Sequence, residues 1–214
     1  MIRLYDYWRS GASYRVRIAL NLKGVPHELV PIDLRAGTQH SEDYRLTNPQ
    51  GLVPALEIEG QILIQSPAIL EWLEERYPNP RLLPEEPDAR AIVRAMAALI
   101  ACDIHPLNNL RVLNTLRSEI AVTDAQIQRW ISKWITAGFD ALETMVKFYG
   151  KGFAFGDTPT LADCYLVPQV YSAERFDVDL VSYPHLCAAA TRSRALNAFD
   201  LASPDRCQRA ATKI

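Results

Sequence analysis

Apolar residues in the first part of the chain switch between the periods of strands and of helices. An apolar run from Ile2 to about Tyr7 predicts a strand, and the amphipathic stretch from about Ser10 to Lys23 predicts a helix that Gly24 ends. Residues 27–32 predict a second strand. The polar stretch 35–49 that follows predicts an exposed segment with a short, irregular helix.

Two short apolar runs, 54–58 and 61–64, flank a Glu-Gly dipeptide that is typical of a hairpin turn. They therefore predict an antiparallel pair of strands. Ser66 has the properties of a helix N-cap, and Pro67 fits the first turn of the helix that follows. The predicted order is a βαβ unit, an irregular helix and a ββα unit.

The composition changes at residues 78–88, where four prolines disfavour regular structure. Beyond this point the apolar period is that of helices. We therefore predict an α/β domain at residues 1–80, a linker at 81–88 and an all-helical domain at 89–214.

Four helices are predicted in the second domain. Two of them start with a capping-box pair, in which a Thr is followed three residues later by a Gln or an Asp. A proline at position 106 is expected to kink the first helix without ending it. The helices are predicted at residues 90–116, at 123–149 with Thr123 and Gln126 as the pair, from 158 onward with Thr160 and Asp163 as the pair, and at about 184–199.

Composition and charge narrow the class of protein. With 214 residues, 49% hydrophobic and 22% charged, the chain is typical of a globular protein with one large or two modest domains. A net charge of -2 gives no electrostatic reason to expect nucleic acid or an anionic membrane as partner. We find no signal peptide and no segment that we expect to span a bilayer, so a cytoplasmic protein is predicted.

The four cysteines lie at Cys102, Cys164, Cys187 and Cys207, without the short spacings of zinc or redox sites. We expect them to be buried and reduced, and we predict no metal site. Residues 1–80 contain no cysteine, which excludes a thiol-disulfide oxidoreductase, since that chemistry requires a protein thiolate.

Three motifs together resemble the cytosolic glutathione transferase superfamily. They are Val53-Pro54 before a strand, Gln65-Ser66-Pro67 at a helix start, and GDTPTLADCYLVPQV at residues 156–170. The resemblance covers nearly the whole chain. It implies a thioredoxin-like α/β domain followed by an all-α domain, glutathione as the cofactor, a homodimer, and a cis bond between Val53 and Pro54.

Within that superfamily, WRSGASYRVRIAL at residues 8–20 resembles the zeta class. The zeta pattern usually reads S-S-C-S-x-R, and here Ala12 stands in place of the cysteine. With CDIHPLNNLR at residues 102–111, this variant more closely resembles the bacterial maleylpyruvate isomerase branch. The resemblance implies conversion of maleylpyruvate to fumarylpyruvate by thiolate addition, bond rotation and elimination, with glutathione regenerated.

The chemistry of several side chains agrees with a glutathione site. Ser10 at a helix N-terminus would stabilise a thiolate through the helix dipole and nearby N–H groups. The backbone of Val53 would pair with the cysteinyl part of the tripeptide. Gln65 and Ser66 at the start of a helix suit the γ-glutamyl carboxylate. The resemblance adds His40 and Gln50 at the glycyl end, and Asp103 at the amino group of the glutathione bound to the other subunit.

A maleyl substrate is a small diacid, and guanidinium groups bind carboxylates with two hydrogen bonds. Arg9, Arg111 and Arg175 are the candidates. His105 and Asn108 lie at three-residue spacings from Arg111, so the three share a face if the helix continues past its proline. The predicted catalytic residues are Ser10, Arg9 and Arg175, and the predicted substrate-binding residues are Arg9, His105, Asn108, Arg111 and Arg175.

Three alternatives stay open. Maleylacetoacetate isomerase performs the same chemistry on a longer substrate, and the sequence does not separate the two cleanly. A general transferase that conjugates electrophiles would favour an apolar pocket, which the three arginines argue against. A non-enzymatic binding module would need neither Ser10 nor paired arginines.

Overall fold

The computed structural model describes residues 1–211. These fall into two compact units, one formed by Met1–Arg81 together with residues from Ala195 onward, the other by Leu82–Arg194. The segment after Ala195 therefore belongs to the first unit by its contacts, although the sequence pattern is helical there. The domain bounds 1–80, 81–88 and 89–214 stay a prediction, and each unit is described by itself below.

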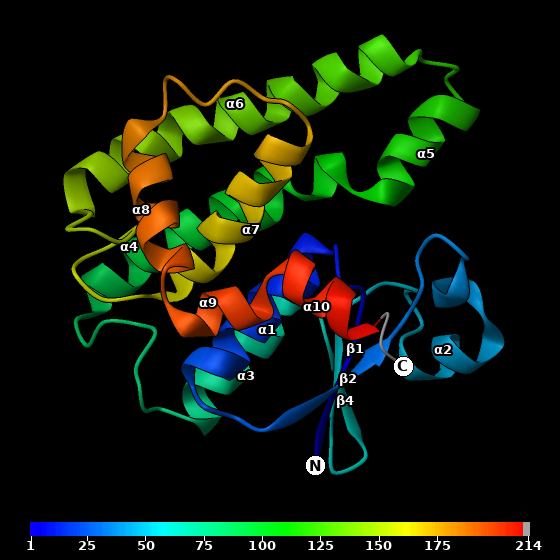
Figure 1. Ribbon diagram of the computed structural model, residues 1–214, viewed down its shortest axis with the longest axis horizontal. Helices are drawn as coiled ribbons and strands as arrows, with labels where there is room; N and C mark the ends of the chain where they lie inside the picture. Colours follow the sequence, from blue (N-terminus) through cyan, green and yellow to red (C-terminus); the bar gives the residue numbers. More distant parts are fainter. Residues whose placement is uncertain (212–214) are drawn as a thin grey trace. The chain divides into compact units, whose positions relative to one another are not determined.

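A four-stranded sheet in the order β2-β1-β3-β4 forms the centre of the first unit (Figure 1). The central strand β1 (Ile2–Asp6) runs parallel to β2 (His27–Pro31) and antiparallel to β3 (Ala55–Ile58). β3 pairs in turn with β4 (Gln61–Ile64), also antiparallel. The predicted strands and the hairpin are confirmed.

The hairpin turn consists of Glu59 with φ 51° and Gly60 with φ 85°. Two consecutive positive φ angles characterise the turn that matches the twist of the flanking strands. The Glu-Gly dipeptide places a glycine at one of these two positions, where a side chain is disfavoured. The turn therefore forms where the sequence predicts it.

Helices α1 (Gly11–Leu22) and α3 (Ser66–Arg76) contact each other, and α1 also contacts α9 (Asn197–Ala202). Gly24, with φ 62°, directly follows the last turn of α1 and its C-cap Lys23, at the position predicted for the end of the helix. The amide of Val25 donates to the Leu20 carbonyl at 2.9 Å and closes this end of the helix.

The polar segment after β2 contains a 3-10 turn, Thr38–His40, and the short helix α2 (Glu42–Thr47). Ser41 caps α2 by accepting a hydrogen bond from the Tyr44 amide at 3.2 Å. The predicted short, irregular helical segment is confirmed.

Two details of the predicted helix boundaries are wrong. Ser66 was predicted to be the N-cap of α3, but Gln65 holds that position. Ser66 is the first residue of the helix, and its side chain is buried. The predicted helix at 184–199 is two helices, because Leu196 is extended with ψ 135° between α8 (Pro184–Arg194) and α9. A further helix, α10 (Pro204–Ala211), was not predicted.

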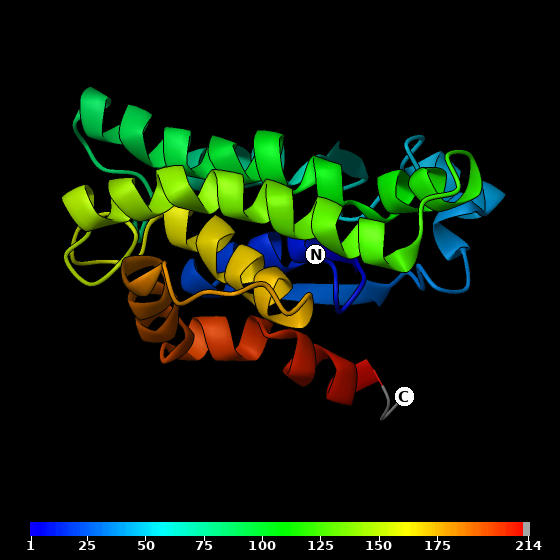
Figure 2. The ribbon, with the colours of Figure 1, turned by 90° about the horizontal axis from the view of Figure 1, so that it is seen from above.

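The regular elements of the second unit are helices. In Figure 2 its longest helix runs alongside the stretch that leads from α4 to α5, and it contacts the π-helical part of that stretch. The elements are α4 (Pro87–Ala98), a π-helical segment (Leu99–Ile104), a 3-10 turn (Pro106–Asn108), α5 (Leu110–Ser118), α6 (Asp124–Tyr149), α7 (Leu161–Arg175) and α8.

The predicted helix at 90–116 is interrupted, not merely kinked. Pro106 has no amide hydrogen and starts a 3-10 turn, and Asn109 is extended with ψ 145°. The Asn109 side chain then accepts a hydrogen bond from the Arg111 amide at 3.1 Å and starts α5 as a new helix.

The stretch Pro87–Ser118, taken as one helix, is long and apolar enough to meet a minimal criterion for a membrane span. This finding differs from our expectation that no segment has the length and composition of a membrane span. One such stretch is weak evidence, because core helices pass the same test. Val93, Met96 and Ile104 in this stretch are buried, but only 28% of its most apolar 18-residue window is buried.

All four cysteines are free, as expected, but the expectation that they are buried is wrong for Cys102, which is exposed. Cys187 is partly exposed, whereas Cys164 and Cys207 are buried. Cys102 differs because it lies in the π-helical segment on a face that does not turn toward the core.

Asp163 confirms the second capping box and lies at the centre of a buried cluster. Its Oδ2 accepts from the Thr160 amide at 2.8 Å and from the Thr160 hydroxyl at 3.1 Å. Its Oδ1 accepts from the Ala154 amide at 2.8 Å and from the Ser193 hydroxyl at 3.4 Å. The carboxylate thus joins the loop before α7, the start of α7 and the end of α8.

Burial raises the pKa of Asp163 from 3.8 to about 6, although the four donors act in the opposite direction. Between these two pH values the folded state binds the proton more tightly than the unfolded state. The free energy of unfolding therefore falls as the pH rises through this window, by about 3 kcal/mol from this group.

Asp163→Asn removes the titration, so the stability advantage of the wild type over this variant should shrink as the pH rises from about 4 to about 7. Urea unfolding at a series of pH values measures it. Asp157→Asn, at an exposed acid in the same loop, serves as the control and should leave the pH dependence unchanged. An advantage that grows with pH would show that the four donors outweigh burial.

Candidate active site

The strands of the first unit bring several candidate segments to one end of the sheet. At the C-terminal end of β1, Asp6 is paired with Pro31 at the end of β2. One residue earlier, Tyr5 is paired with Ala55 at the start of β3, and Ala55 with Ile64 at the end of β4. The segments that follow β1, β2 and β4 and the segment that precedes β3 therefore all lie at the same end of the sheet.

The candidates for glutathione binding in this unit occupy those positions. Arg9 and Ser10 follow β1, the segment with His40 and Gln50 follows β2, Val53 precedes β3, and Gln65 and Ser66 follow β4. Strand register thus gathers residues that are more than 50 positions apart in the sequence.

Ser10 is the N-cap of α1, and its Oγ accepts a hydrogen bond from the Ser13 amide at 3.2 Å. The hydroxyl proton is then free to donate outward. The amides of Gly11 and Ala12 lie in the first turn, where a helix offers no acceptor of its own. One hydroxyl and two amides at the positive end of a helix dipole form a donor set that suits a thiolate.

Arg9 directly precedes Ser10 and is half-buried. Its guanidinium carbon lies 5.3 Å from the centroid of the Trp8 ring, within the range of a cation–π contact. A planar cation next to the α1 N-terminus adds positive charge where a carboxylate of a substrate would be bound.

Gln65 and Gln50, both predicted from the sequence, contact each other. The Gln65 Nε2 donates to the Gln50 Oε1 at 2.6 Å. Gln65 has φ 71°, which is unfavourable for a residue with a side chain by about 1–3 kcal/mol. Such conformations are concentrated at ligand-binding positions, so this one supports a role for Gln65 in binding.

Arg15 contacts a candidate site residue, although the sequence did not single it out. Its side chain is buried, and its Nη1 donates to the Ser66 Oγ at 3.3 Å. This hydrogen bond joins α1 to the first residue of α3. The only signal in the sequence was the arginine of the S-x-R pattern, whose partner lies 51 positions away.

The backbone before β3 is held by two side chains that the sequence also did not single out. The Leu52 carbonyl accepts from the Tyr44 hydroxyl at 2.6 Å and from the Asn48 amide at 2.7 Å. Burial raises the pKa of Tyr44 to about 12, so its hydroxyl remains a donor. The next peptide bond, Val53–Pro54, is cis, as the resemblance implied.

His40 is exposed and lies close to the residue that follows Gln50. A side chain on Gly51, which has φ 62°, would come within 2.8 Å of the Gln39 carbonyl and 3.3 Å of the His40 Nδ1. Glycine at this position therefore lets the 3-10 turn approach the segment that carries Gln50. His40 therefore lies near the segment that carries Gln50, and the roles of both residues stay predictions.

The candidates in the second unit, apart from Arg175, lie in or next to short, irregular pieces of helix. Because the helix breaks after Pro106, the expectation that His105, Asn108 and Arg111 share one continuous helix face is wrong. The side-chain amide of Asn108 is buried and, within residues 1–211, has no hydrogen-bond partner. Asp103 and Arg111 are exposed.

Arg175 is the last residue of α7, and its guanidinium carbon lies 4.3 Å from the centroid of the Phe176 ring. Asp103 is held by the packing of the π-helical segment, because the next residue, Ile104, lies against Gly138 of α6. A Cβ on Gly138 would come within 2.3 Å of the Ile104 Cδ1. π-Helical segments often occur at functional sites.

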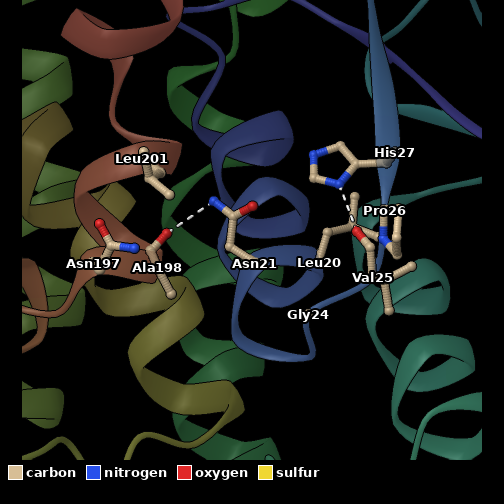
Figure 3. A pocket seen from close by; sticks show the side chains of 9 residues that line it. All are labelled: Leu20, Asn21, Gly24, Val25, Pro26, His27, Asn197, Ala198 and Leu201. Carbon is tan, nitrogen blue, oxygen red and sulfur yellow. Dashed lines mark hydrogen bonds between the residues drawn. The ribbon is translucent and has the colours of Figure 1, made fainter.

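A hollow of about 370 Å³ in the first unit lies away from these residues (Figure 3). It contains His27, the first residue of β2, which is paired with Ile2 at the opposite end of the sheet from Ser10. On one side of the hollow, the Asn21 side chain donates a hydrogen bond to the Ala198 carbonyl at 3.0 Å. This hollow contains none of the predicted site residues.

Among residues 1–211, no group of three or more His, Cys, Asp or Glu side chains is arranged to hold a metal ion.

Family models match both halves of the chain. The N-terminal domain of glutathione S-transferase matches residues 4–81, and the C-terminal domain matches residues 124–201. The chain belongs to the glutathione S-transferase family. The fold class predicted from the sequence, a thioredoxin-like α/β domain with an all-α domain, is confirmed.

Two curated relatives cover nearly the whole of this glutathione S-transferase. It is 53% identical to a maleylpyruvate isomerase from Ralstonia over 205 residues, 95% of this chain and 97% of the relative. It is 50% identical to a maleylacetoacetate isomerase from Pseudomonas aeruginosa over 206 residues, 95% of this chain and 96% of the relative.

Solved structures agree. The holo structure of a bacterial zeta-class maleylpyruvate isomerase is similar with a TM-score of 0.93 and 52% identity, covering 95% of this chain and 97% of that one. A maleylacetoacetate isomerase from Methylobacterium extorquens, solved with bound malonate and glutathione, is similar with a TM-score of 0.92 and 40% identity, covering 95% and 97%. The zeta-class resemblance is confirmed; the roles of individual site residues stay predictions.

Proposed function

We propose that this glutathione S-transferase isomerises maleylpyruvate to fumarylpyruvate with glutathione as cofactor. The start of α1 carries the proposal, because the Ser10 hydroxyl and two first-turn amides form a donor set for a thiolate at the sheet end where the other candidates converge. The similarity over the full length to enzymes named as maleylpyruvate and maleylacetoacetate isomerases supports it.

The residues present fit glutathione by their chemistry. The Gln65–Gln50 pair and the N-terminus of α3 offer donors for a carboxylate, and the backbone of Val53 offers strand-like hydrogen bonds. Glutathione, when bound, supplies the thiol whose thiolate adds to the double bond and is later expelled. In the proposed dimer, Asp103 reaches the amino group of the glutathione bound to the other subunit.

The remaining roles belong to the chain's own cations. Arg9 and Arg175 bind the substrate carboxylates and stabilise the negative charge that develops on the carbonyl oxygen. Arg111, His105 and Asn108 orient the far end of the diacid. The malonate bound to the Methylobacterium relative is a small dicarboxylate of the same kind. We further propose that the enzyme is a homodimer and cytoplasmic.

Turnover of maleylpyruvate and of maleylacetoacetate, each with and without glutathione, tests the function. We expect rapid turnover of maleylpyruvate that requires glutathione and a lower kcat/KM for maleylacetoacetate. A preference for maleylacetoacetate would favour the other isomerase, which the Pseudomonas relative makes the second candidate. Conjugation of aryl halides without isomerisation of either diacid would contradict both.

A further inference from the structure

Arg17 of α1 is almost completely buried, with 1% of its side chain exposed. All three nitrogens of its guanidinium group donate hydrogen bonds. Nη1 donates to the Asp6 carboxylate, Nη2 to the Trp8 carbonyl at 2.9 Å and Nε to the Ala202 carbonyl at 2.9 Å. A buried cation with a partner at each of its three nitrogens is costly to assemble, and stability alone does not require it.

Two of these partners lie at the start of the short connection between β1 and α1 or within it. Asp6 is the last residue of β1, and Trp8 is followed by Arg9 and then Ser10. The same connection is closed by the Ser10 amide, which donates to the Tyr7 carbonyl at 2.8 Å. Arg17 therefore holds the backbone from which the candidate catalytic residues extend.

The third partner, Ala202, lies 185 positions away at the end of α9. A second hydrogen bond between α1 and α9 is made by Asn21, which donates to the Ala198 carbonyl at 3.0 Å. Asn21 lies four residues after Arg17, about one helical turn, and makes no hydrogen bond to the β1–α1 connection within residues 1–211. Arg17 therefore contacts both α9 and the connection, whereas Asn21 contacts α9 alone. Comparing the two side chains separates the effect of attaching α9 from the effect of supporting the connection.

We propose that Arg17 is a positioning residue, which fixes the β1–α1 connection so that the Ser10 hydroxyl and the first amides of α1 face the glutathione sulfur. Through the Ala202 carbonyl, α9 completes this support. The inference rests on the proposed function, since it assumes that Ser10 stabilises a thiolate.

Arg17→Lys tests the proposal, because lysine keeps the charge beside Asp6 but has a single nitrogen in place of the planar fork. The pKa of glutathione bound to the protein, followed by thiolate absorbance, should rise by about one unit, since one unit reflects a modest loss of interaction with the thiolate. We expect kcat to fall about tenfold or more when maleylpyruvate and glutathione are both saturating and the pH lies below the thiol pKa in the variant. The reason is that small misplacements of reacting groups are costly. The KM for glutathione should change much less.

Asn21→Ala is the matched control. It also removes a hydrogen bond between α1 and α9, yet it should leave the thiol pKa and kcat within about twofold of the wild type, as expected for a side chain with no role in positioning. If Arg17→Lys and Asn21→Ala have the same effect, or if folded Arg17→Lys leaves the thiol pKa unchanged, the proposal is wrong.

Should Arg17→Lys fail to fold, the double variant Asp6→Leu with Arg17→Met removes the buried charges together, an exchange that proteins often tolerate. It should show the same rise in thiol pKa. A wild-type protein that binds glutathione without lowering its thiol pKa would contradict the proposed role of Ser10 itself, an outcome distinct from the failure of Arg17→Lys alone.

Discussion

Replacing Ser10 by alanine is expected to lower kcat/KM for isomerisation by about a hundredfold or more, the range seen when one preorganised donor to a developing or bound anion is removed. The hydroxyl is free to donate because its oxygen already accepts from the Ser13 amide. The pKa of the bound glutathione thiol should rise in parallel. Steady-state kinetics and thiolate absorbance measure the two effects.

Loss of the hydroxyl also removes an N-cap, which costs about 1 kcal/mol of stability. Thr123→Ala removes a comparable cap, since the Thr123 Oγ1 accepts from the Gln126 amide at 3.3 Å at the start of α6. It should lower stability by a similar amount and leave kcat/KM unchanged. If the two variants lose activity equally, Ser10 acts only as a cap.

Replacing Lys23 by methionine should destabilise the protein by about 3–5 kcal/mol, as expected when one member of a buried ion pair is removed. The Lys23 ammonium is completely buried and lies 2.7 Å from the Glu74 carboxylate. It also donates to the carbonyls of Tyr77 at 2.6 Å and Pro80 at 3.0 Å. This one side chain therefore joins the end of α1 to α3 and to the proline-rich segment after it.

Urea unfolding measures the loss. Arg206→Met is the control, because its ion pair with Asp200 is exposed and should contribute less than about 1 kcal/mol. The double variant Lys23→Met with Glu74→Leu should recover part of the stability, because both buried charges are then absent. A loss at Lys23 no larger than that at Arg206 would mean that the buried contacts contribute little.

Local patterns were sufficient for most of the regular elements. The Glu-Gly hairpin, the Gly24 helix end and the capping boxes at Thr123 and Thr160 depend on residues within four positions of one another, and each was predicted correctly. The break after Pro106 was not, because the apolar period continues on both sides of it. Only the extended Asn109 shows that two helices meet there.

The candidate site was predictable where a motif is local and not where it depends on distant partners. Ser10 and Gln65 belong to short motifs and were identified. Arg15 and Arg17 were not. Arg15 contacts Ser66, 51 positions away, and Arg17 joins the nearby Asp6 and Trp8 to Ala202, 185 positions away, so these sets of contacts exist only in the tertiary structure. Periodicity marks a buried arginine on α1 as an anomaly, but only the tertiary structure shows what it contacts.

The glutathione candidates and the substrate candidates lie on parts of the structure that differ in how well they tolerate insertions. Those proposed for glutathione, apart from Asp103, lie at the end of a sheet whose register is fixed strand by strand, and a one-residue shift in β3 would turn its core residues outward. Those proposed for the diacid, apart from Arg9 and Arg175, lie between Leu99 and the first turn of α5, where π-helical, 3-10 and extended residues alternate. Among related chains, changes of length and of substrate should therefore accumulate in that segment while the sheet end stays constant.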